Sequence, residues 1–568
     1  MENIKRDLKR RDFVVNTCGL DKAEILPLVE DASARIYFRI KNPDGKTFVL
    51  MDDVSGRCKT YEFSELAEFL AANGVRVPKV LFKDIDGGFL LLEDLGDNTF
   101  TKLLPHSDAR ELYRVGTDLI SRVAAIGNRP TCVKDMSREF VLKDISLFSE
   151  WYYPFTTGHP LSDEANREFQ EIISNIIELG FKAPKSLVLW DYHVDNLMQL
   201  PETKEGAVID FQDALWGPVL YDPVSLLEDA RNEIPEDIVR EMKQRFYENL
   251  GSMSREDFED AWAFFSLHRH LRVLGRFTTL MACNRKTRYL KFIPHIWEML
   301  EKTLEYPKLA KMKSWMDKYM PKEQRGLPKL KPIDKAFMLA AGRGVRMEHL
   351  TDNLPKPLIE VNNKALIDYN FDKISELNIK DVIVNICYQG NKIRNHLALQ
   401  KGFNITYSEE QEALETGGGV KKALPLLGEN AFFVLNSDTF WIEGGYKSAL
   451  WKMYAAWEDD KYDVLLLLHP LDKIIGDRSI GDYKIENGRL FRNTEKVSGF
   501  PYMFAGVSII HPRAFAKSPD GKFSLREIFD AAAEKGRLGY VVNEGTLLHV
   551  GTPKALELAE KSIKCSGF

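Results

Sequence analysis

The chain has 568 residues, which is too many for a single hydrophobic core, so we expect about two to four domains. Its contents of 44% hydrophobic and 29% charged residues are typical of soluble globular domains. The net charge of −6, with acidic and basic residues interspersed, argues against a nucleic-acid partner.

The cysteines and the first residues bear on the cellular compartment. Six cysteines are scattered without the CxxC spacing of a zinc site, and they predict reduced thiols rather than a disulfide framework. The start, MENIKRDLKRRDF, lacks the apolar core of a signal peptide, and no apolar run approaches the roughly 20 residues needed to span a bilayer. We therefore expect a cytoplasmic protein without a membrane partner.

Residues 33–96 predict a small lobe of strands and one helix. Two β-rich runs on either side of the turn NPDGK predict a hairpin. A helix is expected up to Ala72, where Asn73-Gly74 forms a C-cap, and two further strands follow. This is the order of a small kinase lobe, although an unrelated α+β domain would show the same pattern.

In a kinase lobe of this kind, two segments would bind the nucleotide. The backbone of the connector after the last strand, including Glu93 and Leu95, would face the adenine. Residues 31–35, which end in Arg35, would lie over the phosphates.

The stretch 187–213, LVLWDYHVDNLMQLPETKEGAVIDFQD, carries the clearest chemistry. An apolar strand delivers Asp191 to a polar loop, Asn196 follows five residues later, and a returning strand ends in Asp210. Such a hairpin brings the three side chains to one end of a sheet. Phosphoryl transfer needs this set, because one aspartate takes up a hydroxyl proton while an asparagine and a second aspartate hold Mg²⁺ on the nucleotide. The alternative is a hairpin with polar residues at its tips.

The rest of the first half, to about residue 319, is predicted to be mainly helical. It contains the aromatic cluster WYYPF at 151–155 and the basic, aromatic stretch SLHRHLRVLGRF at 266–277. Basic residues at helical spacing are expected to form a solvated face, and the alternative is a site for an anionic sugar substituent. Residues 320–333 hold three prolines and several lysines, which predicts a linker.

From residue 334 onward strands and helices alternate. This pattern predicts a Rossmann-like, doubly wound sheet, whose ligands lie beyond the carboxyl ends of the strands. Loops are expected at three of those ends, namely LAAGRGVRM at 339–347, LETGGG at 414–419 and NSD at 436–438.

Each of these loops has a predicted role. Small residues in the first let backbone N–H groups approach phosphates, and Arg346 and Lys356 add positive charge. In the second, the absence of side chains would let a flat base lie against the backbone. In the third, the carboxylate of Asp438 is placed to hold Mg²⁺.

Residues 1 to about 325 resemble the aminoglycoside phosphotransferase-like kinases, and most of all the anomeric kinases for N-acetylmuramate and N-acetylglucosamine in peptidoglycan recycling. The resemblance is carried by DASARIYFR, FLLLEDLG, WDYHVDNLM, VIDFQDALWGPVLYDPVSLLEDAR and HRHLRVLGRF. It implies a protein-kinase-like domain with a small lobe to about residue 96 and a large lobe over about 97–319. It also implies Asp191 as the catalytic base and Asn196 and Asp210 as magnesium ligands.

Two positions depart from the kinase pattern. The family usually has a histidine two residues before the catalytic aspartate, where this chain has Leu189. Related kinases often have a lysine on the strand TFVLMDD, where this chain has Met51 and then Asp52. The charge of the phosphates would then be neutralised by an arginine such as Arg35 or Arg39.

Residues 334–568 resemble the sugar-1-phosphate nucleotidyltransferases, and most of all those that uridylylate N-acetylmuramate 1-phosphate. The resemblance is carried by LAAGRGVRM, LPKPL, ETGGGVKKALPLLG, LNSD, FAGVSIIHP and HVGTP. It implies catalytic roles at the triphosphate for Arg346 and Lys356, a magnesium ligand in Asp438 and a sugar-proximal Gly506. The residues implied to contact the nucleotide are Ala340, Ala341, Gly342, Gly344, Thr416, Gly417 and Gly418. His549 stands where the family has an aspartate that serves as the second metal ligand. A histidine can bind a metal but suits Mg²⁺ less well than a carboxylate, so the alternatives are that the second ion is held differently or that this half is slow or altered.

The two resemblances together imply a bifunctional enzyme of amino sugars and nucleotides. ATP would phosphorylate the sugar at C1, and UTP would then give a UDP-sugar and pyrophosphate, with Mg²⁺ in both steps. Two alternatives stay open from the sequence: a choline kinase fused to a CTP:phosphocholine cytidylyltransferase, or a chain in which one half has lost catalysis and acts as a nucleotide-binding module. The sequence leaves open the true sugar, the nucleotide base and the oligomeric state.

Overall fold

The computed structural model describes residues 2–28, 35–53, 57–251, 253–284, 286–444, 448–476 and 480–566. The chain forms two compact units. The first comprises Met1–Phe148, Ser162–Gly275 and Lys291–Gly326, and the second comprises Ser149–Leu161, Arg276–Leu290 and Leu327–Phe568. Within the described ranges, no helix combines the length and the apolar character needed to cross a membrane.

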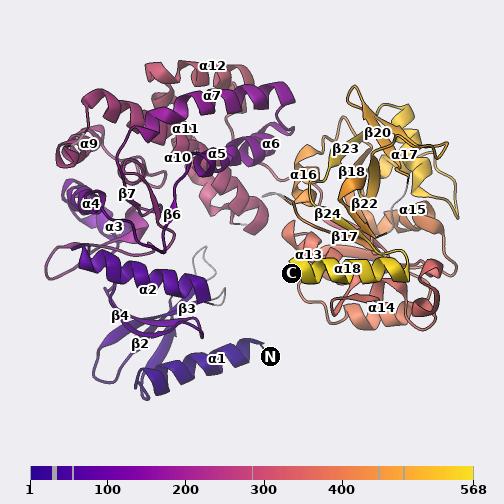
Figure 1. Ribbon diagram of the computed structural model, residues 1–568, viewed down its shortest axis with the longest axis horizontal. Helices are drawn as coiled ribbons and strands as arrows, with labels where there is room; N and C mark the ends of the chain where they lie inside the picture. The colour runs from indigo at the N-terminus through magenta and orange to yellow at the C-terminus, as the bar shows by residue number, and fades with distance from the viewer. Residues whose placement is uncertain are drawn as a thin grey trace. The chain divides into compact units, whose positions relative to one another are not determined.

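The first unit begins with an antiparallel five-stranded sheet, in the order β1-β2-β3-β5-β4 (Figure 1). The predicted turn closes the hairpin of β2 and β3, with the N–H of Asn42 donating to the carbonyl of Lys46 at 2.9 Å. Gly74, at φ 72°, follows the end of α2 as the C-cap signal predicts. The elements are α1 (Glu2–Asp12), β1 (Glu24–Pro27), β2 (Arg35–Lys41), β3 (Thr47–Asp53), α2 (Arg57–Ala72), β4 (Val80–Asp84) and β5 (Phe89–Glu93). Residues 31–34, expected over the phosphates, lie outside the described residues.

Helices make up most of the large lobe. They are α3 (Phe100–Leu103), α4 (Ala109–Ala124), α5 (Arg138–Leu147), α7 (Asp163–Phe181), α8 (Tyr221–Leu227), α9 (Glu236–Leu250), α10 (Arg255–Asn284), α11 (Ile293–Leu304) and α12 (Ala310–Tyr319). A small sheet has the order β6-β10-β7, with β6 (Lys134–Asp135), β7 (Lys185–Val188) and β10 (Leu215–Pro218), and β8 (Leu197–Gln199) pairs with β9 (Gly206–Val208). The β8–β9 hairpin lies within the stretch 187–213, on which the kinase prediction rests.

The basic stretch on α10 is buried, so the prediction of a solvated face is wrong. His268, Arg269 and His270 are only 0%, 3% and 1% exposed. The reason is that α10 runs through the core of the large lobe, where burial lowers the pKa of His268 and His270 and favours their uncharged forms. Asp144 meets His268 at 2.8 Å and Glu228 meets His270 at 3.2 Å.

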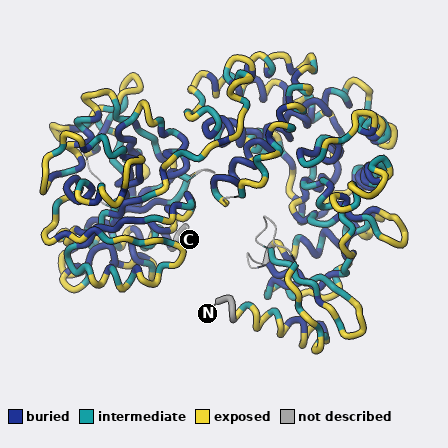
Figure 2. Tube along the Cα trace, turned by 180° about the vertical axis from the view of Figure 1, so that it is seen from behind, coloured by how far each residue is buried: buried dark blue, intermediate teal, exposed yellow. Residues whose placement is uncertain are grey.

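A doubly wound sheet forms the core of the second unit, as the alternating pattern predicts. The path of strands is β15-β14-β11-β16-β22-β18-β23, in which β11 runs parallel to both β14 and β16. These strands are β11 (Lys335–Leu339), β14 (Asp381–Ile386), β15 (Asn404–Glu409), β16 (Phe432–Asn436), β18 (Val464–Pro470), β22 (Tyr502–Ile510) and β23 (Leu538–Val542). Most residues of the central strands are buried between helices (Figure 2), which is why their sequences are almost continuously apolar.

Shorter strands and the helices complete the second unit. The strands are β12 (Glu360–Val361), β13 (Lys364–Ala365), β17 (Thr439–Ile442), β19 (Ile474–Gly476), β20 (Tyr483–Glu486), β21 (Arg489–Arg492) and β24 (Thr546–His549). The helices are α6 (Tyr153–Thr157), α13 (Leu366–Glu376), α14 (Gly390–Leu397), α15 (Glu415–Leu427), α16 (Ala449–Ala456), α17 (Leu525–Glu534) and α18 (Pro553–Ser566). The glycines predicted to form the loop 414–419 are the first turn of α15, so that loop is shorter than expected.

The aromatic cluster at 151–155 and the later part of the proline-rich stretch, residues 327–333, both belong to the second unit. Trp151 lies 4.9 Å from Trp451 between ring centroids, and Phe155 stacks on Tyr454 at 5.6 Å. Lys331 is partly buried, which lowers its pKa to about 8, and its ammonium donates to backbone carbonyls of α16 and of the residue after it. The predicted linker is therefore held in place from Lys331 onward.

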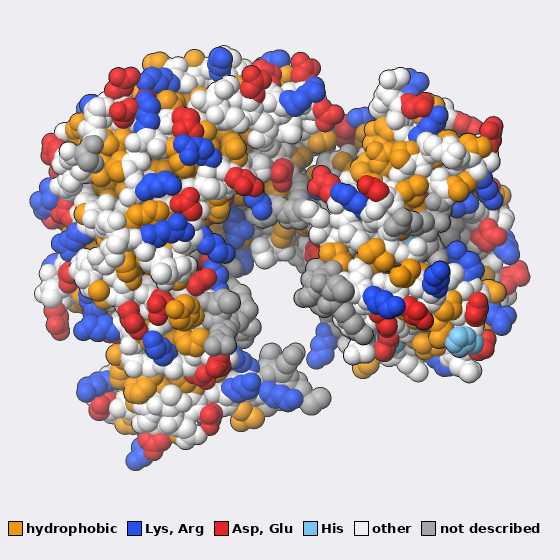
Figure 3. All heavy atoms as spheres, viewed as in Figure 1, with side chains coloured by type: hydrophobic (Ala, Val, Ile, Leu, Met, Phe, Trp, Pro, Cys, Tyr) orange, Lys and Arg blue, Asp and Glu red, His pale blue; other side chains and the backbone are white. Residues whose placement is uncertain are grey.

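Charged side chains of both signs are interspersed over the face drawn in Figure 3. This mixture agrees with the composition, in which 78 basic residues oppose 84 acidic ones. The charge pattern therefore gives no reason to expect a polyanionic partner on that face.

Candidate active sites

The catalytic stretch of the first unit forms a loop between β7 and β8. Asn196 donates from its side-chain amide to the carbonyl of Asp191 at 2.9 Å. The carbonyl of Asn196 accepts the N–H of Ile209 at 3.0 Å, and Ile209 immediately precedes Asp210. The structure therefore brings together the segments that carry Asp191, Asn196 and Asp210, while the roles of the three side chains stay predictions.

A buried carboxylate from α8 holds this loop. Asp222 accepts the backbone N–H groups of Leu189 at 2.5 Å and Trp190 at 3.0 Å. Trp190 has a φ of 74°, in the left-handed region that costs a non-glycine residue about 1–3 kcal/mol. Burial raises the pKa of Asp222 to about 7, against two N–H donors that favour the carboxylate. The sequence quoted for the resemblance contains Asp222, but its role was missed; the available signal is a single acidic residue inside the apolar run VLYDPVSLL.

The cations at Asp210 and Asp213 come from β2 and α2. Arg35 lies 3.2 Å from the carboxylate of Asp210, to which Gln212 also donates at 3.0 Å. Burial raises the pKa of Asp210, and Arg35 partly opposes that shift. Lys59 binds Asp213 at 2.5 Å. Arg35 and Lys59 thus supply positive charge next to the predicted metal ligand.

The other candidate arginine lies elsewhere. Arg39 pairs with Asp94 of the connector at 2.7 Å. Met51, at the position of the usual kinase lysine, is fully buried. Of the two arginines proposed to neutralise the phosphates, Arg35 is the one that lies beside Asp210.

The connector that follows β5 is held by an apolar contact at Leu95 and by an ion pair at Glu93. Leu95 is buried in a cluster with Met198 and Ala207 of the β8–β9 hairpin. The side chain of Glu93 is occupied by Arg76, which it meets at 2.6 Å. Contact between adenine and the backbone at Glu93 and Leu95 stays a prediction.

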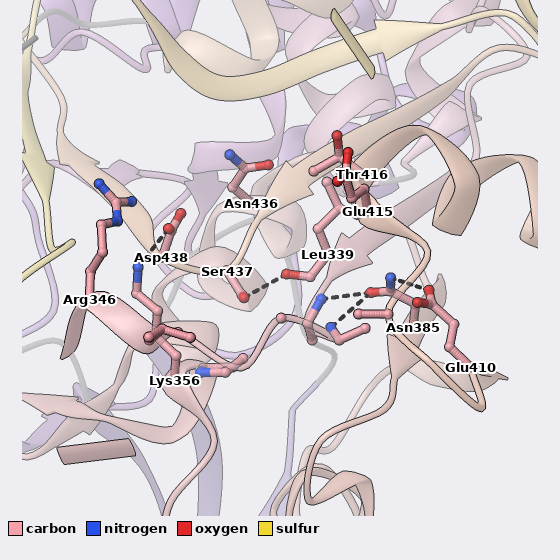
Figure 4. Close-up of a pocket in the computed structure, with 17 residues that line it drawn as sticks. Leu339, Arg346, Lys356, Asn385, Glu410, Glu415, Thr416, Asn436, Ser437 and Asp438 are labelled. Atoms are coloured by element: carbon pink, nitrogen blue, oxygen red, sulfur yellow. Dashed lines mark hydrogen bonds and ion pairs between the residues drawn. The ribbon is translucent and has the colours of Figure 1, made fainter. Parts of the chain in front are cut away.

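The second unit contains a pocket of about 410 Å³ at the carboxyl ends of β11, β14 and β16 (Figure 4). It is lined by Leu339, Ala340, Ala341, Gly342, Gly344, Val345, Arg346, Lys356, Pro357, Asn385, Glu410, Ala413, Glu415, Thr416, Asn436, Ser437 and Asp438. Eight of the residues predicted for this site therefore line one pocket: Ala340, Ala341, Gly342, Gly344, Arg346, Lys356, Thr416 and Asp438. Such a position, beyond the ends of parallel strands, is where doubly wound sheets bind nucleotides.

An ion pair lies on one side of the pocket. The ammonium of Lys356 is 2.8 Å from the carboxylate of Asp438, and Figure 4 shows Arg346 on the same side. Burial would raise the pKa of Asp438, but the charge of Lys356 and its hydrogen bond outweigh burial and lower it. Gly344 makes room for this lysine: it has a φ of 70°, and a Cβ there would lie 2.7 Å from the Cβ of Lys356.

A buried polar network, not foreseen from the sequence, holds the opposite side of the pocket. The side-chain carbonyl of Asn385 accepts the N–H groups of Ala340 at 2.7 Å and Ala341 at 3.3 Å. Its amide donates to Glu410 at 2.7 Å, and Glu410 accepts the N–H of Leu414 at 2.9 Å. One asparagine thus ties the Gly-rich loop to the segment before α15. Its only signal in the sequence is a polar residue near the end of the apolar strand DVIVNI.

In the first turn of α15, Thr416 faces the pocket while Gly417 and Gly418 pack against the segment 521–523. Thr416 lines the pocket, and its hydroxyl accepts the N–H of Leu525 at 2.9 Å. Gly417 and Gly418 donate their N–H groups to the carbonyl of Phe523 at 2.9 and 3.1 Å, and a Cβ on either would meet the segment 521–523 within 2.4 Å. These two glycines are required for close packing, and their contact with a base stays a prediction.

Comparison with known proteins agrees with this division. Residues 24–261 match the phosphotransferase enzyme family, and residues 335–471 match the nucleotidyl transferase family. An N-acetylmuramate/N-acetylglucosamine kinase of Pseudomonas aeruginosa is 33% identical over 311 residues, 53% of this chain and 90% of the relative. An N-acetylmuramate alpha-1-phosphate uridylyltransferase of Caulobacter vibrioides is 39% identical over 230 residues, 40% of this chain and 95% of the relative.

The chain belongs to both families. It is an enzyme that joins a kinase domain to a sugar-1-phosphate nucleotidyltransferase domain, which confirms the predicted fold class and the predicted pair of activities. A second kinase relative, the N-acetylmuramate/N-acetylglucosamine kinase of Neisseria meningitidis, is 31% identical over 317 residues, 54% of this chain and 94% of the relative. Families of these kinds use ATP and other nucleoside triphosphates as substrates.

The donor atoms in both domains suit Mg²⁺. The kinase domain offers the amide oxygen of Asn196 and the carboxylate of Asp210, and the nucleotidyltransferase domain offers Asp438. Mg²⁺ commonly binds one or two carboxylates together with substrate phosphates, so these sets fit the ion. His549 pairs with Thr439 across β17 and β24 and is not among the residues that line the pocket. In the described part of the chain, no group of three or more His, Cys, Asp or Glu forms a metal cage by itself.

Proposed function

We propose that this enzyme phosphorylates N-acetylmuramate, and also N-acetylglucosamine, at C1 with ATP and then converts the sugar 1-phosphate with UTP into a UDP-sugar. The relatives of the first domain are named for kinases of these two sugars. The relatives of the second domain are named for uridylyl transfer to N-acetylmuramate 1-phosphate. Both kinds of domain occur in one chain, and the product of the first reaction is the substrate of the second. That continuity is the observation that carries the proposal.

In the kinase domain, Asp191 accepts the proton of the C1 hydroxyl. The C1 oxygen then forms a bond to the γ-phosphorus of ATP, and the bond between that phosphorus and the bridging oxygen of ADP breaks. Arg35 contributes positive charge beside the phosphates. Asn196 and Asp210 would hold the metal ion on the nucleotide.

In the nucleotidyltransferase domain, a phosphate oxygen of the sugar 1-phosphate attacks the α-phosphorus of UTP. A bond from that phosphorus to the sugar phosphate forms as the bond to pyrophosphate breaks, without a covalent enzyme intermediate. Lys356 and Arg346 stabilise the negative charge that builds on the phosphates, and Asp438 would hold the metal ion. In both domains, Mg²⁺ when bound would neutralise phosphate charge and orient the phosphoryl groups.

The two half-reactions are tested separately with the purified chain. With ATP, Mg²⁺ and N-acetylmuramate alone, ³¹P NMR should show a sugar 1-phosphate in the anomeric region. With synthetic N-acetylmuramate 1-phosphate, UTP and Mg²⁺, pyrophosphate should be released. Phosphorylation at C6, or no phosphorylation of either sugar, would rule out the proposal for the kinase domain.

The choline alternative is not favoured. It requires an aromatic and acidic box around a quaternary ammonium, for which the aromatic cluster at 151–155 was the candidate. The aromatic side chains of Trp151 and Phe155 pack on Trp451 and Tyr454. These rings are part of a packed aromatic core within the second unit.

A further inference from the structure

Arg272 of α10 reaches the catalytic loop of the kinase domain. One end nitrogen of its guanidinium lies 3.9 Å from the carboxylate of Asp191, and its Nε lies 3.1 Å from Asp144. Its guanidinium carbon is 4.5 Å from the centroid of the Trp190 ring. The side chain is 13% exposed, so the cation is anchored at its inner end while part of its surface stays accessible.

The ion pair with Asp144 uses only the Nε end of the Arg272 guanidinium. Asp144 already accepts a hydrogen bond from His268 at 2.8 Å. The separation of 3.9 Å from Asp191 exceeds a hydrogen bond, so these two groups attract each other without using up donors. A guanidinium has five N–H donors in a planar fork that fits a carboxylate with two parallel hydrogen bonds.

The charge of Arg272 is permanent in this setting. Burial lowers its pKa, but the neighbouring Tyr221, Asp144 and Asp191 outweigh burial and raise it. A buried cation of this kind is costly unless it is well compensated. A site that keeps such a cation next to the catalytic base is suited to an acceptor that brings an anion with it.

We infer that Arg272 binds a carboxylate of the acceptor sugar and is the specificity-determining residue of the kinase site. This inference rests on the proposed function. N-acetylmuramate differs from N-acetylglucosamine by a lactyl ether at C3 whose carboxylate is ionised. The C1 hydroxyl and this substituent belong to the same ring, so one sugar can place its hydroxyl on Asp191 and its carboxylate on the adjacent Arg272.

The substrate side provides a test without any mutation. The wild-type chain is given ATP and either N-acetylmuramate or its lactyl carboxamide, and kcat/KM for phosphorylation is measured with each. A charge-assisted hydrogen bond that is lost corresponds to roughly a 10- to 100-fold reduction with the carboxamide. Equal kcat/KM for acid and amide would overturn the inference.

The protein side uses Arg272→Gln, Arg272→Lys and the control Arg276→Gln. Arg276 is an exposed arginine four residues further along α10, so its replacement removes a guanidinium from the same helix. Arg272→Gln should lower kcat/KM for N-acetylmuramate roughly 10- to 100-fold, while kcat/KM for N-acetylglucosamine should change only a few-fold. Arg272→Lys keeps the charge and should retain much of the preference, and the control should match wild type with both sugars.

The outcomes separate this inference from the proposed function. If wild type phosphorylates neither sugar, the proposed function itself fails. If Arg272→Gln folds and kcat/KM falls equally for both sugars, Arg272 acts through the charge of Asp191 and not through the substrate carboxylate, and the inference is wrong. If Arg272→Gln does not fold, the comparison of acid and carboxamide on wild type still decides.

Discussion

Replacing Asp222 by asparagine removes the group that holds the catalytic loop of the kinase domain while leaving the proposed catalytic residues in place. The carboxylate accepts two backbone N–H groups, at 2.5 and 3.0 Å. An asparagine offers one carbonyl oxygen to one of these donors and turns its own N–H₂ group toward the other. Above about pH 7, where Asp222 is ionised, one hydrogen bond to a charged acceptor is lost, which corresponds to about 1.5–3 kcal/mol.

That loss is comparable with the strain the loop carries. The left-handed backbone at Trp190, with φ 74°, costs about 1–3 kcal/mol, so without its second acceptor the loop is free to relax. We expect kcat/KM for sugar phosphorylation to fall about 10- to 100-fold, at 1.36 kcal/mol per tenfold change. Uridylyl transfer to preformed sugar 1-phosphate serves as the internal control and should not change. A suitable matched variant is Glu236→Gln, which removes an exposed carboxylate on α9 that pairs with Lys302.

The assay is a steady-state measurement of both half-reactions with Asp222→Asn, Glu236→Gln and wild type. A folded Asp222→Asn enzyme with unchanged phosphorylation would refute the reasoning. So would an equal loss in both half-reactions, because the two backbone N–H groups that Asp222 accepts belong to the kinase loop.

The remaining predictions address pH, the second site and the division into units. The pKa of Asp222 is raised from 3.8 to about 7, so the folded state binds its proton more tightly; the stability this provides is present below about pH 4 and lost as the pH rises toward about 7. The free energy of unfolding of wild type relative to Asp222→Asn should therefore decrease by up to about 4 kcal/mol over that range, and a difference independent of pH would contradict this assignment. Lys356→Met should slow uridylyl transfer about 100- to 1000-fold with phosphorylation intact, and equal effects on both rates would count against its role. Asn385→Leu leaves buried N–H groups unpaired, so thermal unfolding should show a loss of about 1–3 kcal/mol together with a higher KM for UTP. A fragment of residues 327–568 lacks Trp151, which packs on Trp451, and it should unfold at a lower temperature than the same unit in the whole chain.

Local patterns were sufficient to predict the main elements. The turn NPDGK specifies its hairpin because proline, aspartate and glycine favour the required backbone angles. The parallel strands β11, β14 and β16 are recognisable because burial on both faces makes them almost continuously apolar. Residues placed at the ends of such strands, like Asp438, converge on one edge of the sheet, so the pocket was accessible to the same reasoning.

Polar side chains that act through distant partners could not be foreseen in this way. Asp222 holds a loop that lies earlier in the chain: its hydrogen-bond partners Leu189 and Trp190 precede it by 33 and 32 residues. Asn385 joins segments 45 and 25 residues away. Nothing in the local sequence of either residue names its partner, because the partner is chosen by tertiary packing.

The solvated face predicted for α10 was wrong, and the packing of the aromatic segment at 151–155 was not foreseen, for a related reason. Basic residues at helical spacing form a solvated face only if no acidic side chains pack against them. Here α10 runs through the core of the large lobe, where Asp144 accepts a hydrogen bond from His268 and burial lowers the pKa of both His268 and His270. Similarly, the packing of Trp151 is decided by α16, about 300 residues away in sequence.

The most direct measurement of the central claim is a coupled assay of the whole chain. Wild type, Asp191→Ala and Asp438→Ala are incubated with N-acetylmuramate, ATP, UTP and Mg²⁺, and the sugar products are identified by mass spectrometry. We predict UDP-N-acetylmuramate from wild type, unreacted sugar from Asp191→Ala and accumulated sugar 1-phosphate from Asp438→Ala. A wild-type chain that forms no UDP-sugar, or an Asp191→Ala chain that still forms it at the wild-type rate, would contradict the account.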